Sequence, residues 1–287
     1  MDTSNNFTSL RKYFNHLVST LEDSKVTPSA QFEVEMLFEA YYNKSFKELY
    51  FFLDKGLLKK DEEDLNKLIQ RRIANCEPIQ YITNKAYFRN LELYVAPGVL
   101  IPRPETEILV DWVLNKAKKY DNVKVLDVGT GSGAIALSIA QERPQFSVTA
   151  LDISNDALAI AKKNLDNLKL NNVNLISSNL LDNIGSQKFN IIAANLPYVT
   201  FEEYEMLPLD VKLHEPQLAL TAPNNGLELL YKTADSLKEH LTSDGCAIFE
   251  LSPHQAPIFA TDLSQYGFKT KILKDLTNRD RFVIGEL

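Results

Sequence analysis

The stretch "VLDVGTGSGAIALSIA", residues 125–140, decides the fold of this chain. It begins as a short apolar strand, turns at Gly129, Gly131 and Gly133, and continues as an apolar helix. Glycines let a backbone turn tightly and come close to a ligand. The helix that follows directs its free N–H groups at the same place. The stretch therefore predicts a strand–loop–helix unit that holds a ligand at the carboxyl end of its strand.

A carboxylate lies at the end of the next predicted strand. Asp152 follows Gly129 by 23 residues and belongs to "SVTALDIS", residues 147–154. A carboxylate in this place can accept two hydrogen bonds from a ribose diol. Because Ala134 also completes a relaxed dinucleotide-binding pattern, the glycine loop alone leaves both NAD and S-adenosylmethionine (SAM) open.

Strands and helices alternate from residue 123 to the end of the chain. The predicted strands cover residues 123–129, 147–154, 174–181, 189–198, 245–252, 268–275 and 281–287. The predicted helices between them cover residues 132–144, 155–170 and 226–245. Apolar strands that alternate with helices are typical of a mostly parallel sheet covered on both faces. We therefore expect an α/β fold with a Rossmann-like, seven-stranded, mostly parallel sheet.

The first quarter of the chain is predicted to be a helical bundle. Apolar residues recur at helical spacing, and Ser45 with Glu48 forms a capping-box pattern. The predicted helices cover residues 7–21, 29–42, 45–56 and 61–75. The region contains no cluster of catalytic residue types, so we expect it to serve packing or docking.

A connector separates the bundle from the alternating region. Aromatic and β-branched residues around Asn84 and Lys85 indicate a β-hairpin. Three prolines then stiffen "APGVLIPRPETE", residues 96–107. These patterns predict a bundle over residues 1–77, a hairpin and Pro-rich connector over 78–104, and the α/β domain over 105–287.

Composition excludes several classes of protein. The N-terminus lacks the basic and apolar regions of a signal peptide, and no apolar run is long enough to cross a bilayer. Two distant cysteines without nearby histidines indicate neither a disulfide framework nor a metal site. A net charge of −7 argues against stable binding to nucleic acid. We expect a cytoplasmic protein, and nothing in the sequence demands more than a monomer.

The motif "NLPY", residues 195–198, follows the fourth predicted strand. The side-chain carbonyl of Asn195 and the backbone carbonyl of Leu196 can together accept both hydrogens of one planar –NH2 group. Such acceptors align a poorly nucleophilic nitrogen with a reactive carbon. Tyr198 can flank the substrate or face a sulfonium through a cation–π contact. A hydride-transfer enzyme has no need for this arrangement.

These motifs together resemble the PrmC/HemK family of glutamine methyltransferases. The resemblance covers nearly the whole chain and rests on motifs in the family's order. They are "EPIQYITNKAYF", "LIPRPETE", "VLDVGTGSGAIALSIA", "LDIS", "NLPYV", "HEPQLAL", "NGLELLYK" and "NRDRFVIG". The family uses SAM to methylate the glutamine of the Gly-Gly-Gln motif in peptide chain release factors, and it releases S-adenosylhomocysteine. The resemblance thus implies a SAM-dependent protein-(glutamine-N5) methyltransferase.

The resemblance also implies roles for individual residues. Gly129, Thr130, Gly131, Ser132 and Gly133 would wrap the methionine part of SAM, and Asp152 would hold its ribose. Asn179 and Leu180 would lie beside the adenine. Asn195, Leu196, Pro197 and Tyr198 would hold the glutamine amide, with Asn195 also bordering SAM. The N-terminal bundle would help to dock the release factor.

The sequence departs from the family pattern at three places. Leu196 replaces a usual proline, but it retains the backbone carbonyl, and Pro197 still favours an extended conformation at Leu196. Asn179 replaces a common aspartate, and its side-chain carbonyl can still accept from the adenine amino group. The segment "ELSPHQ", residues 250–255, lacks the glycine expected after its strand.

Four other functions remain open at the level of sequence. A glutamine methyltransferase that acts on a ribosomal protein would share the NLPY motif and most of the fold. An N6-adenine DNA methyltransferase uses a similar motif, but it usually adds a basic surface and a recognition region that this chain lacks. The changes at Leu196 and Asn179 also allow a SAM-binding module without turnover. An NAD-binding enzyme is disfavoured by the NLPY motif.

Overall fold

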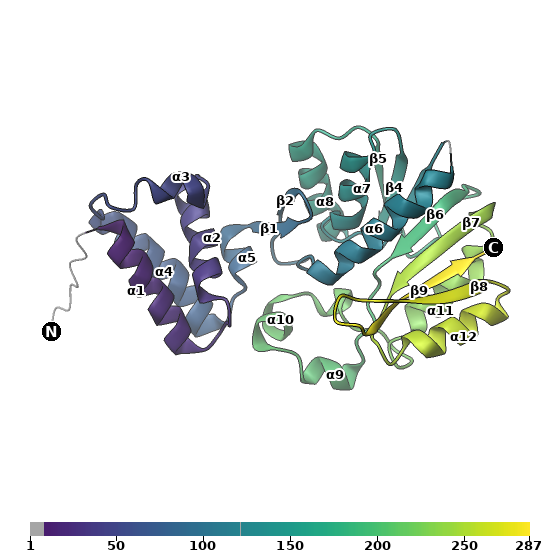
Figure 1. Ribbon diagram of the computed structural model, residues 1–287. Helices are drawn as coiled ribbons and strands as arrows, with labels where there is room; N and C mark the ends of the chain where they lie inside the picture. Colours follow the sequence, from purple (N-terminus) through teal and green to yellow (C-terminus); the bar gives the residue numbers. More distant parts are fainter. Residues whose placement is uncertain (1–8, 121) are drawn as a thin grey trace. The chain divides into compact units, whose positions relative to one another are not determined.

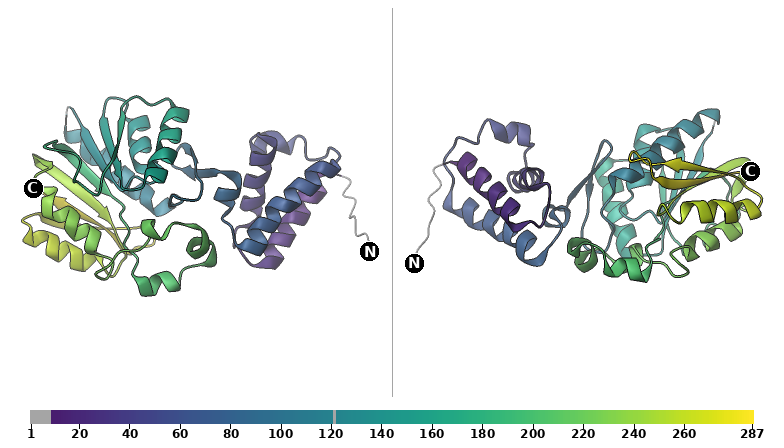
Figure 2. Two further views of the ribbon diagram at one scale, coloured as in Figure 1. Left: turned by 180° about the vertical axis from the view of Figure 1, so that it is seen from behind. Right: turned by 60° about the horizontal axis from the view of Figure 1, so that its bottom comes forward.

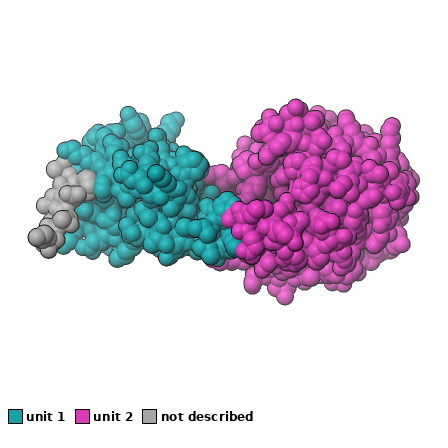
Figure 3. Space-filling model, turned by 90° about the horizontal axis from the view of Figure 1, so that it is seen from below, with its two compact units in different colours: residues 1–85, 208–214 teal, residues 86–207, 215–287 magenta. Residues whose placement is uncertain are grey.

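A computed structural model describes residues 9–120 and 122–287 of the chain. The chain folds into two compact units, coloured separately in Figure 3. Unit 1 comprises residues 1–85 and 208–214, and unit 2 comprises residues 86–207 and 215–287. None of the described helices is both long and apolar enough to cross a membrane.

Unit 1 is a bundle of helices around its own apolar core (Figure 1). Its helices are α1 (Leu10–Ser24), α2 (Ala30–Tyr42), α3 (Phe46–Tyr50), α4 (Lys59–Asn75), α5 (Ile79–Thr83) and α10 (Leu209–His214). The capping box predicted at Ser45 and Glu48 is confirmed, but α3 ends at Tyr50 and does not reach Gly56. Residues 7 and 8 of the first predicted helix lie outside the described residues.

The predicted hairpin is confirmed, with its turn further along the chain. Its strands are β1 (Lys85–Phe88) and β2 (Leu91–Tyr94), joined at Arg89 and Asn90. Asn84 does not form the hairpin turn. It ends α5 in the left-handed conformation, with φ of 55°, which asparagine adopts more readily than most residues.

Unit 2 contains the predicted seven-stranded sheet, in the order β5-β4-β3-β6-β7-β9-β8. The strands are β3 (Lys124–Val128), β4 (Ser147–Asp152), β5 (Val173–Ser177), β6 (Phe189–Ala194), β7 (Leu241–Glu250), β8 (Lys269–Lys274) and β9 (Asp280–Glu286). The five strands from β5 to β7 are parallel, and β9 runs antiparallel to both of its neighbours. The strand order reverses between β3 and β6, where ligands bind in such sheets.

Helices cover both faces of this sheet (Figures 1 and 2). One face packs against α6 (Glu107–Lys116), α7 (Ala134–Glu142) and α8 (Asn155–Leu168). The other packs against α11 (Glu228–Leu237) and α12 (Ala256–Gln265). Short helical segments make up the remainder, namely η1 (Pro104–Thr106), η2 (Ala117–Lys119), α9 (Phe201–Glu205) and η3 (Gln217–Ala219).

Two sequence-based expectations fail in this region. The helix predicted to reach Gly245 ends at Leu237, because β7 begins at Leu241. From Leu241 on, the chain pairs with β6 of the sheet. Just before that point, the N–H of Phe189 in β6 donates to the carbonyl of His240 at 2.8 Å. Helix α12 follows the "ELSPHQ" segment and was not predicted.

Candidate active site

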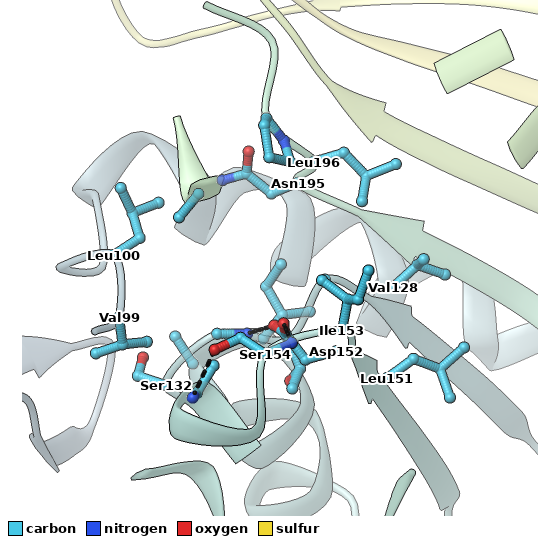
Figure 4. Close-up of a pocket in the computed structure, with 18 of the residues that line it drawn as sticks. Val99, Leu100, Val128, Ser132, Leu151, Asp152, Ile153, Ser154, Asn195 and Leu196 are labelled. Carbon is cyan, nitrogen blue, oxygen red and sulfur yellow. Dashed lines mark hydrogen bonds between the residues drawn. The ribbon is translucent and has the colours of Figure 1, made fainter. Parts of the chain in front are cut away.

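A cavity opens at the carboxyl ends of β3, β4 and β6, and all of its lining residues belong to unit 2. Val128 is level with Leu151 on one side and with Ala194 on the other. The next residues, Gly129, Asp152 and Asn195, therefore lie at three adjacent strand ends. Figure 4 shows Asn195 and Leu196 on one side of the cavity and Asp152, Ile153 and Ser154 on the opposite side. The fold thus unites the glycine loop, the acid and the NLPY motif.

The glycine loop has the conformation that the sequence predicts. Gly129, Gly131 and Gly133 have φ values of 76°, 55° and 88°, in the left-handed region. A Cβ atom on Gly133 would lie 2.7 Å from the Leu137 side chain, so any larger residue would force that side chain to shift. Thr130 and Ser132 between them are buried and also line the cavity. The loop therefore forms part of the cavity wall.

Asp127, which we did not single out from the sequence, holds this loop in place through hydrogen bonds from within the protein core. Its fully buried Oδ2 accepts from the Thr130 hydroxyl at 2.7 Å and from the Ala136 N–H at 3.2 Å. Its Oδ1 has no partner among the described residues. Burial raises the pKa of Asp127 to about 7. An acid inside the otherwise apolar "VLDVG" was the signal available in the sequence.

Asp152 lies at the cavity wall and is already oriented by the backbone. Its Oδ2 accepts from the Gly131 N–H at 2.8 Å, and its Oδ1 accepts from the Ser154 N–H at 2.9 Å. Burial raises the pKa of Asp152, and these hydrogen bonds oppose the rise. Each carboxylate oxygen can accept a further hydrogen bond. The geometry suits a carboxylate that receives a diol.

Asn179 and Leu180 line the same cavity. The Asn179 amide nitrogen donates to Asp182 at 3.0 Å, so its carbonyl oxygen is the atom left to accept from a ligand. Leu180 takes a left-handed conformation with φ of 50°, and its carbonyl accepts from the Ser178 hydroxyl at 2.8 Å. The asparagine in place of aspartate therefore presents the same kind of acceptor.

The NLPY motif divides between the cavity and its support. Asn195, Leu196 and Pro197 line the cavity, and the Asn195 amide nitrogen donates to the Thr106 hydroxyl at 3.1 Å. Tyr198 is not among the lining residues. Its hydroxyl accepts from Arg281 at 2.7 Å, and burial raises its pKa to about 12. Tyr198 is therefore a neutral phenol turned to Arg281.

The leucine at position 196 has a packing role that a backbone argument misses. Its side chain is only 4% exposed and belongs to the core of the sheet. A Cβ atom on Gly129 would lie 3.0 Å from the Leu196 side chain. Leu196 therefore packs directly against the glycine loop.

The "ELSPHQ" segment supports the motif from behind. The buried Gln255 amide donates to the carbonyl oxygens of Tyr198 at 2.7 Å and Asn225 at 2.8 Å. Its own carbonyl accepts from the Ser252 N–H at 3.0 Å. Thr106, Gln255 and Asp127 are thus the supporting residues that sequence reasoning did not identify.

A partly buried ion pair joins two further family motifs. Arg103 of "LIPRPETE" donates to Glu215 of "HEPQLAL" at 2.6 Å, and Glu215 also accepts from the Ile101 N–H at 3.1 Å. The Glu215 side chain is 1% exposed, whereas Arg103 borders the cavity. The pair holds the Pro-rich connector at the cavity wall.

Comparison with known proteins decides the family. Family models for the PrmC N-terminal domain and the methyltransferase small domain match residues 12–83 and 104–207. A release factor glutamine methyltransferase of Lactococcus lactis is 41% identical over 75% of this chain and 79% of its own length. That of Streptococcus pneumoniae is 35% identical over 93% of this chain and 96% of its own length. This chain belongs to the release factor glutamine methyltransferase family.

Membership confirms the resemblance and decides between the two cofactors that the glycine loop left open. As a member of the release factor glutamine methyltransferase family, the chain is a SAM-dependent methyltransferase. A solved methyltransferase from Pyrococcus furiosus shares the fold, with a TM-score of 0.51 at 16% identity over 78% of this chain and 97% of that one. The NAD alternative is therefore excluded.

Proposed function

We propose that this chain methylates the side-chain amide nitrogen of the glutamine in the Gly-Gly-Gln motif of peptide chain release factors. The observation that carries the proposal is the orientation of Asn195. Its nitrogen is occupied by Thr106, so its oxygen is the atom offered to an amide –NH2 group beside the glycine loop. The names of the two relatives described above agree with this substrate.

The residues of the cavity fit SAM. Gly129 to Gly133 allow the backbone to approach the methionine part closely, and Asp152 offers a carboxylate to the ribose. Leu180 and the Asn179 carbonyl offer an apolar wall and an acceptor to the adenine. When bound, SAM supplies a methyl group on a positively charged sulfur and leaves as S-adenosylhomocysteine.

Asn195 and Leu196 provide the catalytic alignment. The Asn195 side-chain oxygen and the Leu196 backbone carbonyl each accept a hydrogen bond from one N–H group of the glutamine amide. These two hydrogen bonds fix the orientation of the amide nitrogen toward the methyl group of SAM. Fixed dipoles and alignment are large catalytic contributions. The methylated nitrogen becomes strongly acidic and loses its extra proton to water, so no side-chain base is required. Pro197 restrains the backbone at Leu196.

The remaining parts have supporting roles in this proposal. Unit 1 with its own core docks the release factor, the Pro-rich connector borders the cavity, and unit 2 carries the chemistry. Tyr198 acts through Arg281 and not by direct contact with the sulfonium. The protein acts as a monomer in the cytoplasm, where release factors are found.

The test is methyl transfer followed by mass spectrometry. The protein is mixed with SAM and unmethylated release factor, and the peptide that contains Gly-Gly-Gln is weighed after digestion. We expect one added methyl on that glutamine, and none when Asn195 is replaced by alanine. A ribosomal protein and adenine-containing DNA serve as parallel substrates, and methylation of either in place of the release factor would contradict the proposal. SAM binding without methylation of any of the three would indicate a module that lacks turnover.

A further inference from the structure

The two ligands proposed for this cavity differ in charge. SAM carries a carboxylate on its methionine part, whereas a glutamine side chain and the two glycines before it are uncharged. Moving a carboxylate from water into a cavity costs free energy unless a cation or hydrogen-bond donors meet it there. The cavity wall must therefore provide a partner for one anion, and that anion comes with SAM.

The backbone of the glycine loop has few donors left for this carboxylate. Its N–H groups already donate within unit 2, from Gly129 and Thr130 to the Leu151 carbonyl at 2.9 and 2.7 Å, from Gly131 to Asp152 at 2.8 Å, and from Gly133 to the Thr130 carbonyl at 2.9 Å. Four of the five N–H groups of residues 129–133 are thus occupied. The loop can approach the methionine part closely, but most donors for its carboxylate have to come from elsewhere.

Arg103 has the only cationic side chain among the described residues that line the cavity. This side chain is 32% exposed, so part of it faces open space. A guanidinium carries five N–H donors in a planar arrangement that fits a carboxylate. One nitrogen, Nη2, donates to Glu215 at 2.6 Å, which leaves further donors for a second carboxylate. Arg103 therefore has both the charge and the donors that the carboxylate of SAM requires.

The connector places Arg103 on the wall between the glycine loop and the NLPY motif. Before Arg103 in the chain, the Val99 side chain lies 3.5 Å from the place that a Cβ atom on Gly131 would occupy. After it, the Thr106 hydroxyl lies 3.1 Å from the Asn195 nitrogen. Figure 4 shows Val99 and Asn195 at different sides of the cavity. Arg103 therefore belongs to the wall that the methionine part would face.

Glu215 fixes the position of this guanidinium. The Glu215 side chain is buried, and it also accepts from the Ile101 N–H at 3.1 Å. A buried carboxylate that loses its cation is left uncompensated at a high cost in free energy, so the pair stays formed with or without a ligand. Arg103 is therefore held at the wall in advance, and it loses little conformational entropy when a ligand binds.

We propose that Arg103 binds the carboxylate of SAM. This inference rests on the proposed placement of SAM in the cavity, but it does not depend on which substrate receives the methyl group. S-adenosylhomocysteine keeps the same carboxylate, so Arg103 holds cofactor and product alike. Because the contact is the same before and after methyl transfer, it contributes to binding and not to the rate of the chemical step.

The test is titration calorimetry with two ligands that differ only in the carboxylate. The first is S-adenosylhomocysteine, and the second is S-adenosyl-3-thiopropylamine, the same molecule with hydrogen in place of the carboxylate. Wild type should bind the first about 10- to 100-fold more tightly, because hydrogen bonds between charged groups are strong. In Arg103→Met, affinity for the first ligand should fall about 10- to 100-fold, whereas affinity for the second should stay within about threefold.

Two further variants separate ligand recognition from folding. Arg103→Met leaves Glu215 buried without its cation, so a double variant, Arg103→Met with Glu215→Gln, removes both charges and should show the same loss of preference. Arg143→Met is the matched control, because Arg143 is not among the residues that line the cavity and donates to the Glu142 carbonyl at 2.8 Å. It should keep the wild-type affinities for both ligands.

The preference between the two ligands decides the result. Equal losses for both ligands would show a structural defect and overturn the assignment. An undiminished preference for S-adenosylhomocysteine in both Arg103 variants, or the absence of any preference in wild type, would also overturn it. Failure of the proposed function is distinguishable, because a wild-type protein that methylates no release factor can still bind these ligands and show the preference.

Discussion

One buried and one half-buried aspartate on adjacent strands, Asp127 and Asp152, show how local contacts separate roles within one site. Asp127 accepts hydrogen bonds from Thr130 and Ala136 of the glycine loop and its helix, and its other oxygen has no partner among the described residues. Asp152 is held by two backbone N–H groups and reaches the cavity wall. Burial raises the pKa of both. We therefore assign ligand binding to Asp152 and loop support to Asp127.

Replacing Asp152 by alanine should weaken SAM binding about 10- to 100-fold, because hydrogen bonds to a charged group contribute about 1.5–3 kcal/mol. Titration calorimetry with SAM measures this directly. The matched comparison is Asn195→Ala, which should keep SAM affinity within about threefold while it abolishes methyl transfer. Unchanged affinity in Asp152→Ala would remove the ribose assignment.

Asp127 should make stability depend on pH. Its folded pKa of about 7 lies above the ordinary value near 3.9, so the folded state binds more protons between these pH values. The free energy of unfolding therefore loses a contribution as pH rises through this window. Asp127→Asn removes the titration, so its stability relative to wild type should rise by about 2–3 kcal/mol between pH 5 and pH 8.

Urea unfolding followed by fluorescence measures this difference. The single tryptophan, Trp112, lies in α6 and reports on unit 2. Other titrating groups are common to both proteins, so subtraction isolates Asp127. A difference between the two proteins that does not change with pH would contradict the raised pKa.

At the scale of elements, the loop after the NLPY motif depends on one glycine. Gly226 has φ of 79°, and a Cβ atom there would lie 2.0 Å from the Tyr198 carbonyl oxygen and 2.3 Å from the Gln255 amide. The loop also closes on itself, since the N–H of Val199 donates to Leu220 at 2.9 Å. Its backbone therefore has little room to move.

Gly226→Ala should displace Tyr198 and the motif before it, lowering kcat at least about tenfold and stability by about 3 kcal/mol or more. Gly185→Ala is the control, because Gly185 has a similar φ of 59° but nothing within 4 Å of the added Cβ. It should cost only about 1–2 kcal/mol of left-handed strain and leave kcat unchanged. Thermal unfolding and methyl-transfer rates of both variants measure the difference, and equal effects would show that strain alone matters.

The sequence predicted elements best where a local signal was strong. Apolar strands followed by glycines or an acid located the sheet and placed Asp152 and Asn195 at its carboxyl edge. Element ends that depend on strand pairing were missed. For example, β7 begins at Leu241, where it pairs with β6, and α11 therefore ends at Leu237 and does not reach Gly245 as predicted. Thr106 and Gln255 were missed as supports of the site because the residues they support, Asn195, Tyr198 and Asn225, lie 30 or more residues away in the sequence.

At the scale of the whole molecule, the chain forms two units with separate apolar cores, and the order of residues in the sequence does not separate these units. Residues 208–214 follow the NLPY loop in the chain but belong to unit 1. Within that unit, Arg72 donates to Glu33 at 2.8 Å and lies 3.5 Å from Asp210 of α10. No local pattern in residues 208–214 could indicate a partner more than a hundred residues earlier.

Replacing Arg72 by methionine should destabilise unit 1 by about 3–5 kcal/mol, because it leaves the Glu33 charge buried and unpaired. Calorimetry with and without SAM separates the units, since SAM should raise only the melting temperature of unit 2. The variant should lower the unit 1 transition and keep SAM affinity. Arg11→Met breaks the exposed pair with Asp54 and should cost less than about 1 kcal/mol. Equal costs in the two variants would contradict the stabilising role assigned to the buried pair, and a loss of SAM affinity would contradict the independence of the two cores.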